Sequence, residues 1–236
     1  MPQKLRRKGA VMKRSEVNSI IRDMENLIEE HRFALPGFCS WTPEEWKTKG
    51  HEFDEIRDNM LGWDITDFGQ DRFRQFGFAL ITIRNGNCRM EKYKKPYAEK
   101  LMMLYAGQDS AMHFHQHKME DIINRGGNDV YIKVYNGCPD GKMLDTHVTL
   151  VTDGQKRVVP AGTRIRLSPG DSLTITPYMY HDFHVEPTGG AVLLGEVSMC
   201  NDDENDNWFY EPTGRFPKIE EDEAPYRLLC TEYPKA

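Results

Sequence analysis

The sequence predicts a mainly β protein, a β-barrel or jelly roll that carries helices at its N-terminus. Two observations predict this class: apolar residues recur at helical spacing only near the start, and after Phe76 short β-rich runs alternate with turn signals. A third is that strands and helices do not alternate along the chain, which disfavours a parallel α/β sheet. The length of 236 residues fits one domain with additions.

Residues 1–66 are predicted to form an N-terminal helical extension. Ser15 is a candidate N-cap, and the apolar residues after it recur at helical spacing: Val17, Ile20, Ile21, Met24, Leu27 and Ile28. This helix is expected to end near Phe33, before Pro36-Gly37. Thr42, with Pro43 and Glu45 after it, predicts a capping box at the start of a second helix. A third, short helix is expected over residues 52–60.

Residues 67–236 are predicted to form the barrel and a C-terminal loop segment. Turn signals such as Asn85-Gly86 and Asp153-Gly154 separate the β-rich runs. Many short strands at this spacing are typical of a sandwich or a barrel. Residues 201–225 are rich in Asp, Glu, Asn and Pro and are expected to form a long loop. The expected strands cover residues 78–83, 100–105, 130–135, 147–151, 164–167, 172–176, 181–185 and 191–198.

Composition and charge limit the partners and the compartment. The formal net charge of −6 gives no electrostatic reason to expect binding to nucleic acid or to an anionic membrane. The sequence shows no secretory signal, and no stretch approaches the roughly 20 apolar residues of a membrane helix. The 5 cysteines are an odd number, are scattered, and form no CxxC pair. These features predict a cytoplasmic protein with reduced thiols.

One stretch predicts a metal site. His113 and His115 stand at i and i+2, so on a strand both imidazoles point to the same face. Glu120 follows closely and can add a carboxylate. His181 comes after a Pro-Gly-Asp turn and a strand that ends at Pro177, which positions a fourth ligand. Neutral imidazoles with a carboxylate suit a divalent first-row metal, so the candidate ligands are His113, His115, Glu120 and His181.

The spacing leaves two alternatives open. His117 competes with His113, because 115, 117 and 120 also give two histidines and a carboxylate. His184 competes in the same way with His181. The alternative explanation is three clustered histidines on a solvated strand edge, which a lone His would favour. The coincidence of an H-x-H, a nearby Glu and a distant turn-positioned His favours a metal site.

These residues resemble the motifs of the cupin family. The pattern Gly107-x5-His113-x-His115-x4-Glu120-x6-Gly127 is similar to the first cupin motif with every element in place. The second motif is represented by Gly170, Pro177 and His181, with spacing shortened by one residue and no glycine after the proline. The resemblance implies a cupin barrel, a jelly roll of β-strands.

Longer blocks resemble the D-lyxose isomerases, over roughly the C-terminal two-thirds of the chain. They are residues 113–127, Tyr180-His181, residues 195–216 and the closing Ile219-Glu-Glu-Asp-Glu. The resemblance implies a metal-dependent aldose–ketose isomerase of free sugars, converting D-lyxose to D-xylulose and also D-mannose to D-fructose. It implies Mn²⁺ as the metal, with Zn²⁺, Co²⁺ and Fe²⁺ as alternatives, and a homodimer.

Aldose–ketose isomerisation moves a proton between C1 and C2 through an enediol, which needs a Lewis acid and a base. On composition alone Glu211 is a solvated loop charge, but the resemblance makes it the first candidate base, ahead of Glu196 on the preceding strand. Lys118 is the candidate that stabilises the enediolate, although regular strand alternation would turn it away from the ligand face. Asp203 and Arg215 are candidates for binding sugar hydroxyls.

Two other functions fit the same motif. A cupin dioxygenase would hold iron with the same ligands, and a sugar-binding cupin without activity would use the same pocket. Isomerisation needs no oxygen, and a pure binder has no need of a metal. A phosphosugar isomerase would need a cluster of Arg or Lys near the motifs, and the sequence has none there.

Overall fold

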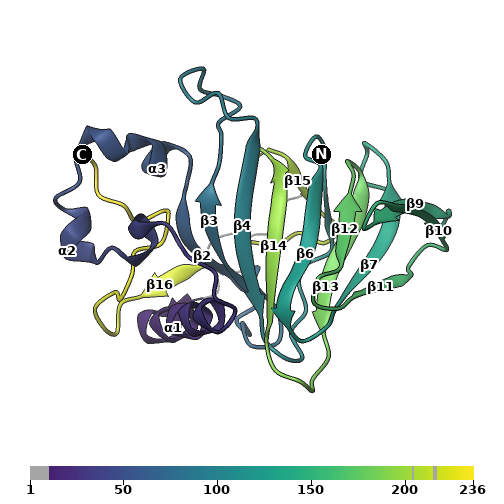
Figure 1. The fold of residues 1–236 in the computed structure, drawn as a ribbon, viewed down its shortest axis with the longest axis horizontal. Helices are drawn as coiled ribbons and strands as arrows, with labels where there is room; N and C mark the ends of the chain where they lie inside the picture. The colour runs from purple at the N-terminus through teal and green to yellow at the C-terminus, as the bar shows by residue number, and fades with distance from the viewer. Residues whose placement is uncertain (1–10, 204, 215–216) are drawn as a thin grey trace.

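Two curved β-sheets face each other and enclose the main hydrophobic core (Figure 1). The structure is a computed structural model that describes residues 11–203, 205–214 and 217–236. The prediction of a mainly β protein with a barrel is confirmed by the two paired sheets. The larger sheet has the order β10-β9-β12-β6-β14-β4-β3-β2. Its strands are β2 (Gly62–Thr66), β3 (Phe78–Arg84), β4 (Tyr97–Leu104), β6 (Glu120–Gly127), β9 (Val148–Thr152), β10 (Gln155–Val159), β12 (Ser172–Ile175) and β14 (Val192–Met199).

The smaller sheet has the order β11-β7-β13-β5-β15, and β8 pairs with β7 at its margin. Side chains alternate between the barrel interior and the outside along its longer strands, as the burial of every second residue of β7 and β13 shows. Its strands are β5 (His113–His115), β7 (Val130–Gly137), β8 (Met143–Leu144), β11 (Arg164–Leu167), β13 (Met179–Val185) and β15 (Asn207–Phe209).

The helices lie on one side of the barrel, at the left in Figure 1. Helix α1 (Arg14–Glu30) starts one residue before the expected cap: Lys13 is the N-cap, and Ser15 donates its hydroxyl proton to Asp222 instead. The predicted capping box at Thr42 is confirmed at the start of α2 (Pro43–Trp46). The third helical segment consists of η2 (His51–Phe53) and α3 (Asp54–Asp58), and a further turn, η1 (Gly37–Ser40), precedes α2.

A second hydrophobic core joins helix α1 to the outside of the larger sheet. Ile20, Ile21 and Met24 of the helix are fully buried and belong to one cluster with Ile81 and Leu101 of the sheet. Strand β3 is therefore buried on both faces, because one face lines the barrel and the other lies under α1. Strand β2, within the segment expected to be helical, pairs with β3 and extends the sheet.

The last part of the chain returns to the first. Strand β16 (Lys218–Glu220) pairs in parallel with β1 (Val11–Lys13). Arg14, which is buried, forms ion pairs with Glu221 at 2.7 Å and Glu232 at 2.5 Å. These contacts tie α1 to the C-terminal segment. No described helix has the length and apolar character needed to cross a bilayer.

Candidate metal centre and active site

Three buried histidines meet inside the barrel. His113 and His115 lie on β5, both facing inward, and His181 on β13 is the direct cross-strand partner of His113. One nitrogen from each ring lies within 4.8 Å of the others. Strand β15 closes the far side of β5, where Phe209 pairs with His113. The i, i+2 spacing thus has the predicted effect of directing two imidazoles to one face.

Backbone carbonyls fix the ring orientation of two of these histidines. Nδ1 of His113 lies 2.9 Å from the carbonyl oxygen of Ala111, and Nδ1 of His181 lies 3.0 Å from that of Met179. A carbonyl only accepts, so each Nδ1 carries the proton and each Nε2 presents a lone pair. Burial, followed by the nearby charges of His181 and His115, holds the pKa of His113 well below its usual range, so this ring is neutral.

Glu120 supplies an anionic oxygen to the cluster. Its Oε1 lies 3.3 Å from Nε2 of both His115 and His181, and its Oε2 lies 2.5 Å from Nζ of Lys118. Burial alone would raise the pKa of this carboxyl. The charges of Lys118 and then His115 outweigh it and hold the pKa well below its usual range, so Glu120 is ionised.

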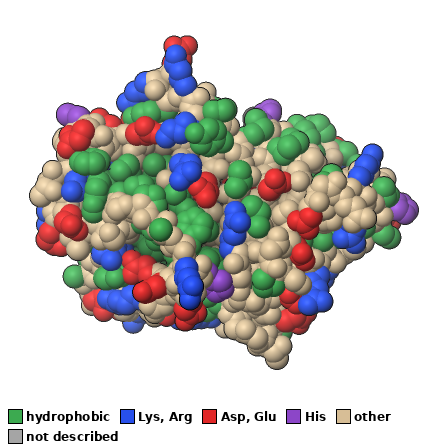
Figure 2. All heavy atoms as spheres, viewed as in Figure 1, with side chains coloured by type: hydrophobic (Ala, Val, Ile, Leu, Met, Phe, Trp, Pro, Cys, Tyr) green, Lys and Arg blue, Asp and Glu red, His purple; other side chains and the backbone are tan. Residues whose placement is uncertain are grey.

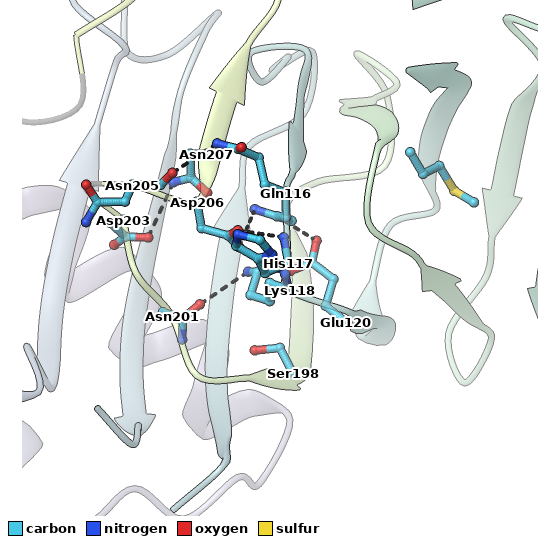
Figure 3. Close-up of polar contacts among 12 residues, drawn as sticks. Gln116, His117, Lys118, Glu120, Ser198, Asn201, Asp203, Asn205, Asp206 and Asn207 are labelled. Atoms are coloured by element: carbon cyan, nitrogen blue, oxygen red, sulfur yellow. Dashed lines mark hydrogen bonds and ion pairs between the residues drawn. The ribbon is translucent and has the colours of Figure 1, made fainter. Parts of the chain in front are cut away.

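Lys118 lies in the centre of a buried charged network. Its Nζ donates to Glu196 at 2.9 Å and to Oδ1 of Asn201 at 3.2 Å, the second contact being drawn in Figure 3. Burial lowers the pKa of Lys118, but Glu120 and Glu196 outweigh it and raise the pKa above its usual value. A second buried ammonium, Lys100, donates to the same Asn201 oxygen at 2.7 Å. The network therefore holds charged lysines beside charged carboxylates.

The end of strand β5 explains why Lys118 points inward. Regular alternation would have turned it away, but β5 stops at His115 and the chain turns before β6 begins at Glu120. Asp206 fixes this turn by accepting the backbone N–H of His117 at 2.7 Å and of Lys118 at 3.1 Å (Figure 3).

These groups line one small cavity of about 40 Å³ in the barrel. Phe68, Phe78, Phe183 and Phe209 form an apolar wall. The polar lining consists of Lys100, His113, His115, Lys118, Glu120, His181, Glu196, Asp203 and Asn207. The cavity thus brings imidazole, carboxylate and ammonium groups together beside an aromatic surface.

The two alternative histidines lie elsewhere. The side chain of His117 is exposed. His184 contacts Asp109 at 2.7 Å and Glu186 at 3.7 Å, outside the cluster. The structure therefore groups His181 with His113 and His115, and leaves His117 and His184 apart.

The remaining candidates divide into three cases. Asp203 lines the cavity. Glu211 is exposed, follows β15, and lines a neighbouring cavity with Ser110 and Asp182 instead of the histidine cavity. Arg215 lies outside the described residues. The structure thus brings seven residues named in the sequence analysis to one cavity but leaves the candidate base Glu211 outside it. The seven are His113, His115, Lys118, Glu120, His181, Glu196 and Asp203.

Sequence reasoning missed Lys100, Asn201 and Asp206. Asn201 and Asp206 lie within the block 195–216 that resembles the D-lyxose isomerases but were not singled out there, and Lys100 lies outside every motif. Lys100 carried one usable signal, because it is a charged residue directly before the apolar run Leu101 to Leu104 of β4. A buried charge requires a partner, so its position pointed to a network inside the barrel.

The donor set suits a divalent first-row metal. Neutral imidazole nitrogens and one carboxylate oxygen converge, and such mixed N/O ligands hold Mn²⁺, Fe²⁺, Co²⁺ or Zn²⁺. Nδ1 of His115 and Nε2 of His181 are buried and have no hydrogen-bond partner. A buried polar atom without a partner costs about 1–3 kcal/mol, which a cation bound to Nε2 of His181 would offset.

Solved structures share the fold at low sequence identity. The L-ribose isomerase of Acinetobacter sp. DL28 matches 91% of this chain and 100% of its own with a TM-score of 0.61 at 12% identity. The L-ribose isomerase of Cellulomonas parahominis matches 90% of this chain and 100% of its own with a TM-score of 0.59 at 16% identity. The arrangement of the barrel with its added helices is thus shared over the whole length of both proteins.

Sequence comparison gives the family. A protein of Serratia proteamaculans named D-lyxose/D-mannose isomerase is 43% identical over 223 residues, 94% of this chain and 98% of that protein. A protein of Escherichia coli O157:H7 with the same name is 41% identical over the same share of both chains. The family model described as D-lyxose isomerase matches residues 12–233. The chain belongs to the D-lyxose isomerase family, a family of aldose–ketose isomerases.

Proposed function

We propose that this protein interconverts free D-lyxose and D-xylulose, and D-mannose and D-fructose as a second pair. The observation that carries the proposal is the buried cluster of His113, His115, His181 and Glu120 with Lys118 beside it, in a chain of this family. Lyxose and mannose share their configuration at C2, C3 and C4. A site that recognises this end of the sugar would accept both.

His113, His115, Glu120 and His181 are the proposed ligands of a divalent metal, with Mn²⁺ the first choice and Zn²⁺, Co²⁺ or Fe²⁺ as alternatives. When bound, the ion supplies Lewis acidity that polarises the carbonyl and hydroxyl oxygens at C1 and C2. Mn²⁺ accepts mixed nitrogen and oxygen ligands and six-coordination, which leaves room for substrate oxygens beside four protein ligands.

Lys118 is the proposed group that stabilises the enediolate. Its ammonium is held by Glu120 and Glu196 and is charged, so it can donate a proton in a hydrogen bond to the oxygen that gains negative charge. Because the network is buried, this interaction is screened by little water. Asp203, which lines the cavity, and Arg215 are the proposed contacts for sugar hydroxyls.

Glu211 is the proposed base that carries the proton between C1 and C2. It is exposed and would have to move from its neighbouring cavity toward the histidines when the sugar binds. Glu196 is the second candidate, because its carboxylate already lies in the cavity. The two positions offer a matched pair of variants for the test.

Glu211→Gln should lower kcat by about 10²–10⁴ while metal content stays unchanged, because the base acts mainly in the transition state. The assay measures D-xylulose formed from D-lyxose by metal-stripped protein to which each divalent ion is returned. Glu196→Gln is the comparison variant. If it abolishes proton transfer while Glu211→Gln remains fully active, the base is Glu196.

The reaction in deuterated water tests the enediol step itself. Proton transfer through an exchangeable carboxyl should place deuterium at C1 of the ketose. A product without label, together with a fully active Glu211→Gln enzyme, would contradict both the base assignment and the enediol step and would favour a hydride shift. An activity that required oxygen would contradict isomerisation altogether.

A homodimer in the cytoplasm is the proposed state of the protein. Tyr97, Val197 and Met199 are large hydrophobic residues exposed on β4 and β14, and hydrophobic side chains are visible between the charged ones on this face (Figure 2). Burial of such a surface between two copies is favourable. All five cysteines are free thiols, which suits a reducing compartment. Light scattering on the intact protein measures the mass.

A further inference from the structure

The cavity that holds the histidines continues into a second one along the inside of the barrel. Inward-facing residues of β3 follow in the order Phe78, Leu80, Thr82; the first two line the histidine cavity and the third lines the next one. Lys100 on β4 lines both cavities. We call the second cavity the distal chamber; it is lined by Asn59, Thr82, Asn85, Lys100, Asn201 and Asp203 among others.

The volumes show that the histidine cavity is too small for a whole sugar. At about 40 Å³ it has room for a few water molecules, since each needs roughly 10–15 Å³ of such volume. The distal chamber adds about 120 Å³ directly beyond Lys100. An open-chain aldose whose C1 and C2 lie among the histidines must therefore extend its remaining carbons into neighbouring space.

The chemistry of the walls decides the direction. The part of the histidine cavity that Phe68, Phe183 and Phe209 line offers no partner to a hydroxyl group. Each buried hydroxyl without a partner would cost about 1–3 kcal/mol. Toward Lys100 the lining is made of amides, a hydroxyl and an ammonium, which can donate to and accept from hydroxyls.

Hydrogen bonds hold the polar wall of the distal chamber, and one buried donor in it has no partner. The amides of Asn59 and Asn85 each donate to the other's backbone carbonyl, at 3.1 and 3.2 Å. Asn85 accepts the backbone N–H of Asn201 at 3.0 Å. The amide nitrogen Nδ2 of Asn201 is buried and has no hydrogen-bond partner. A bound hydroxyl would satisfy it.

We propose that the distal chamber binds the hydroxyl-bearing tail of the open-chain aldose, from C4 onward, and sets the preference between five- and six-carbon sugars. The inference rests on the proposed function, since it assumes that C1 and C2 react among the histidines. Lys100 and Asp203 line both cavities and so stand at their junction. Thr82, the cross-strand partner of Lys100, lines only the distal chamber, where we place the sixth carbon that a hexose has and a pentose lacks.

Thr82→Leu tests the chamber by filling it without touching the histidines. We expect kcat/KM for D-mannose to fall about tenfold or more and that for D-lyxose by less than about threefold, because the larger side chain displaces the last carbon of the longer sugar. Thr82→Val, which has nearly the same shape, should give a smaller loss in the same direction. Thr82→Ser keeps the hydroxyl and is the matched control, with both sugars unchanged.

Binding of the sugar alcohols separates this inference from the proposed function. D-mannitol and D-arabinitol are the open-chain alcohols of mannose and lyxose, and calorimetry on the protein supplied with Mn²⁺ needs no turnover. Thr82→Leu should weaken mannitol binding about tenfold and leave arabinitol within about threefold. Equal losses for both alcohols, or no change for either, would overturn the distal chamber. A wild-type protein that binds both alcohols but isomerises neither sugar would contradict the proposed function. It would not contradict the binding of the sugar tail in the distal chamber.

Discussion

At the scale of single residues, the position of each histidine decides whether it belongs to the metal centre. His181 and His184 lie three residues apart on β13, yet only His181 turns inward to meet His113. His184 pairs with Asp109 near the surface. The same contrast separates His115, which is buried, from His117, which is exposed.

The two residues of β13 provide a direct test of the ligand set. His181→Ala should lose most of the bound metal. The carbonyl of Met179 fixes the ring of His181 through Nδ1, and the Nε2 that this ring presents has no replacement nearby. His184→Ala is the matched control and should keep the metal. His117→Ala should also keep it and is the control for His115→Ala. Elemental analysis after dialysis measures the content. Full occupancy in His181→Ala, or loss in His184→Ala, would show that the assignment is wrong.

At the same scale, the sequence predicted the cluster and missed its surroundings. The motif spacing gave His113, His115, Glu120 and His181, because period-two alternation on a strand is a short-range property that spacing records. Asn201 joins Lys118 and Lys100 across the barrel. Such a contact depends on tertiary packing, and spacing along the chain does not record it.

At the scale of elements, strand length decided which elements were predicted. Longer or alternating strands of the larger sheet, such as β14 and β12, were expected within one or two residues. Strands β5 and β15 have three residues each, too few for a period to be visible. Strand β2 was missed although Trp63 and Ile65 alternate with Asp64 and Thr66, because it has only five residues and directly follows the helical segments. The expected loop 201–225 therefore contains β15, which closes the site.

The contact of α1 with the C-terminal segment should be an important source of stability. Arg14→Met leaves the carboxylates of Glu221 and Glu232 without their buried partner, and we expect the free energy of unfolding to fall by about 2–3 kcal/mol. Glu29→Met is the control on the exposed side of the same helix and should change it by less than about 0.5 kcal/mol. Urea denaturation followed by circular dichroism measures both.

The same ion pair makes a prediction about acid. The hydrogen bond from Arg14 lowers the pKa of Glu221 below its ordinary value of 4.5. A carboxyl group whose pKa is lowered by folding stabilises the protein at pH values above its ordinary pKa. This contribution is lost as the pH falls through the lowered pKa of the folded protein. When the pH is lowered from 5, the free energy of unfolding should therefore fall less in Arg14→Met than in the wild type. An equal loss would show that Glu221 gains nothing from Arg14.

At the scale of the whole molecule, the two hydrophobic cores share the larger sheet. Residues of β3 and β4 alternate between the barrel core and the core under α1: Leu80 and Met102 belong to the first, Ile81 and Leu101 to the second. Residues 1–66 and 67–236 were expected as an extension and a barrel. The shared sheet favours cooperative unfolding of the two parts.

Ile20→Ala tests this cooperativity. Ile20 on α1 is fully buried, so its truncation should cost about 2–4 kcal/mol. Hydrogen exchange read by mass spectrometry should show amides of α1 and of barrel strand β7 losing protection to the same extent. Loss confined to α1 would mean that residues 1–66 open independently of the barrel.

The parallel pairing of β1 with β16 also bears on how the protein is made. A ribosome releases β1 and α1 first, but their partners Lys218–Glu220, Glu221 and Glu232 emerge only when more than two hundred further residues have been added. At a rate of about 5–20 residues per second, that interval lasts roughly 10–40 seconds. During it the buried guanidinium of Arg14 has no carboxylate beside it and β1 has an open edge. The nascent chain therefore has a long period in which a chaperone can bind β1 and α1, and this period ends only when residues 218–232 have emerged.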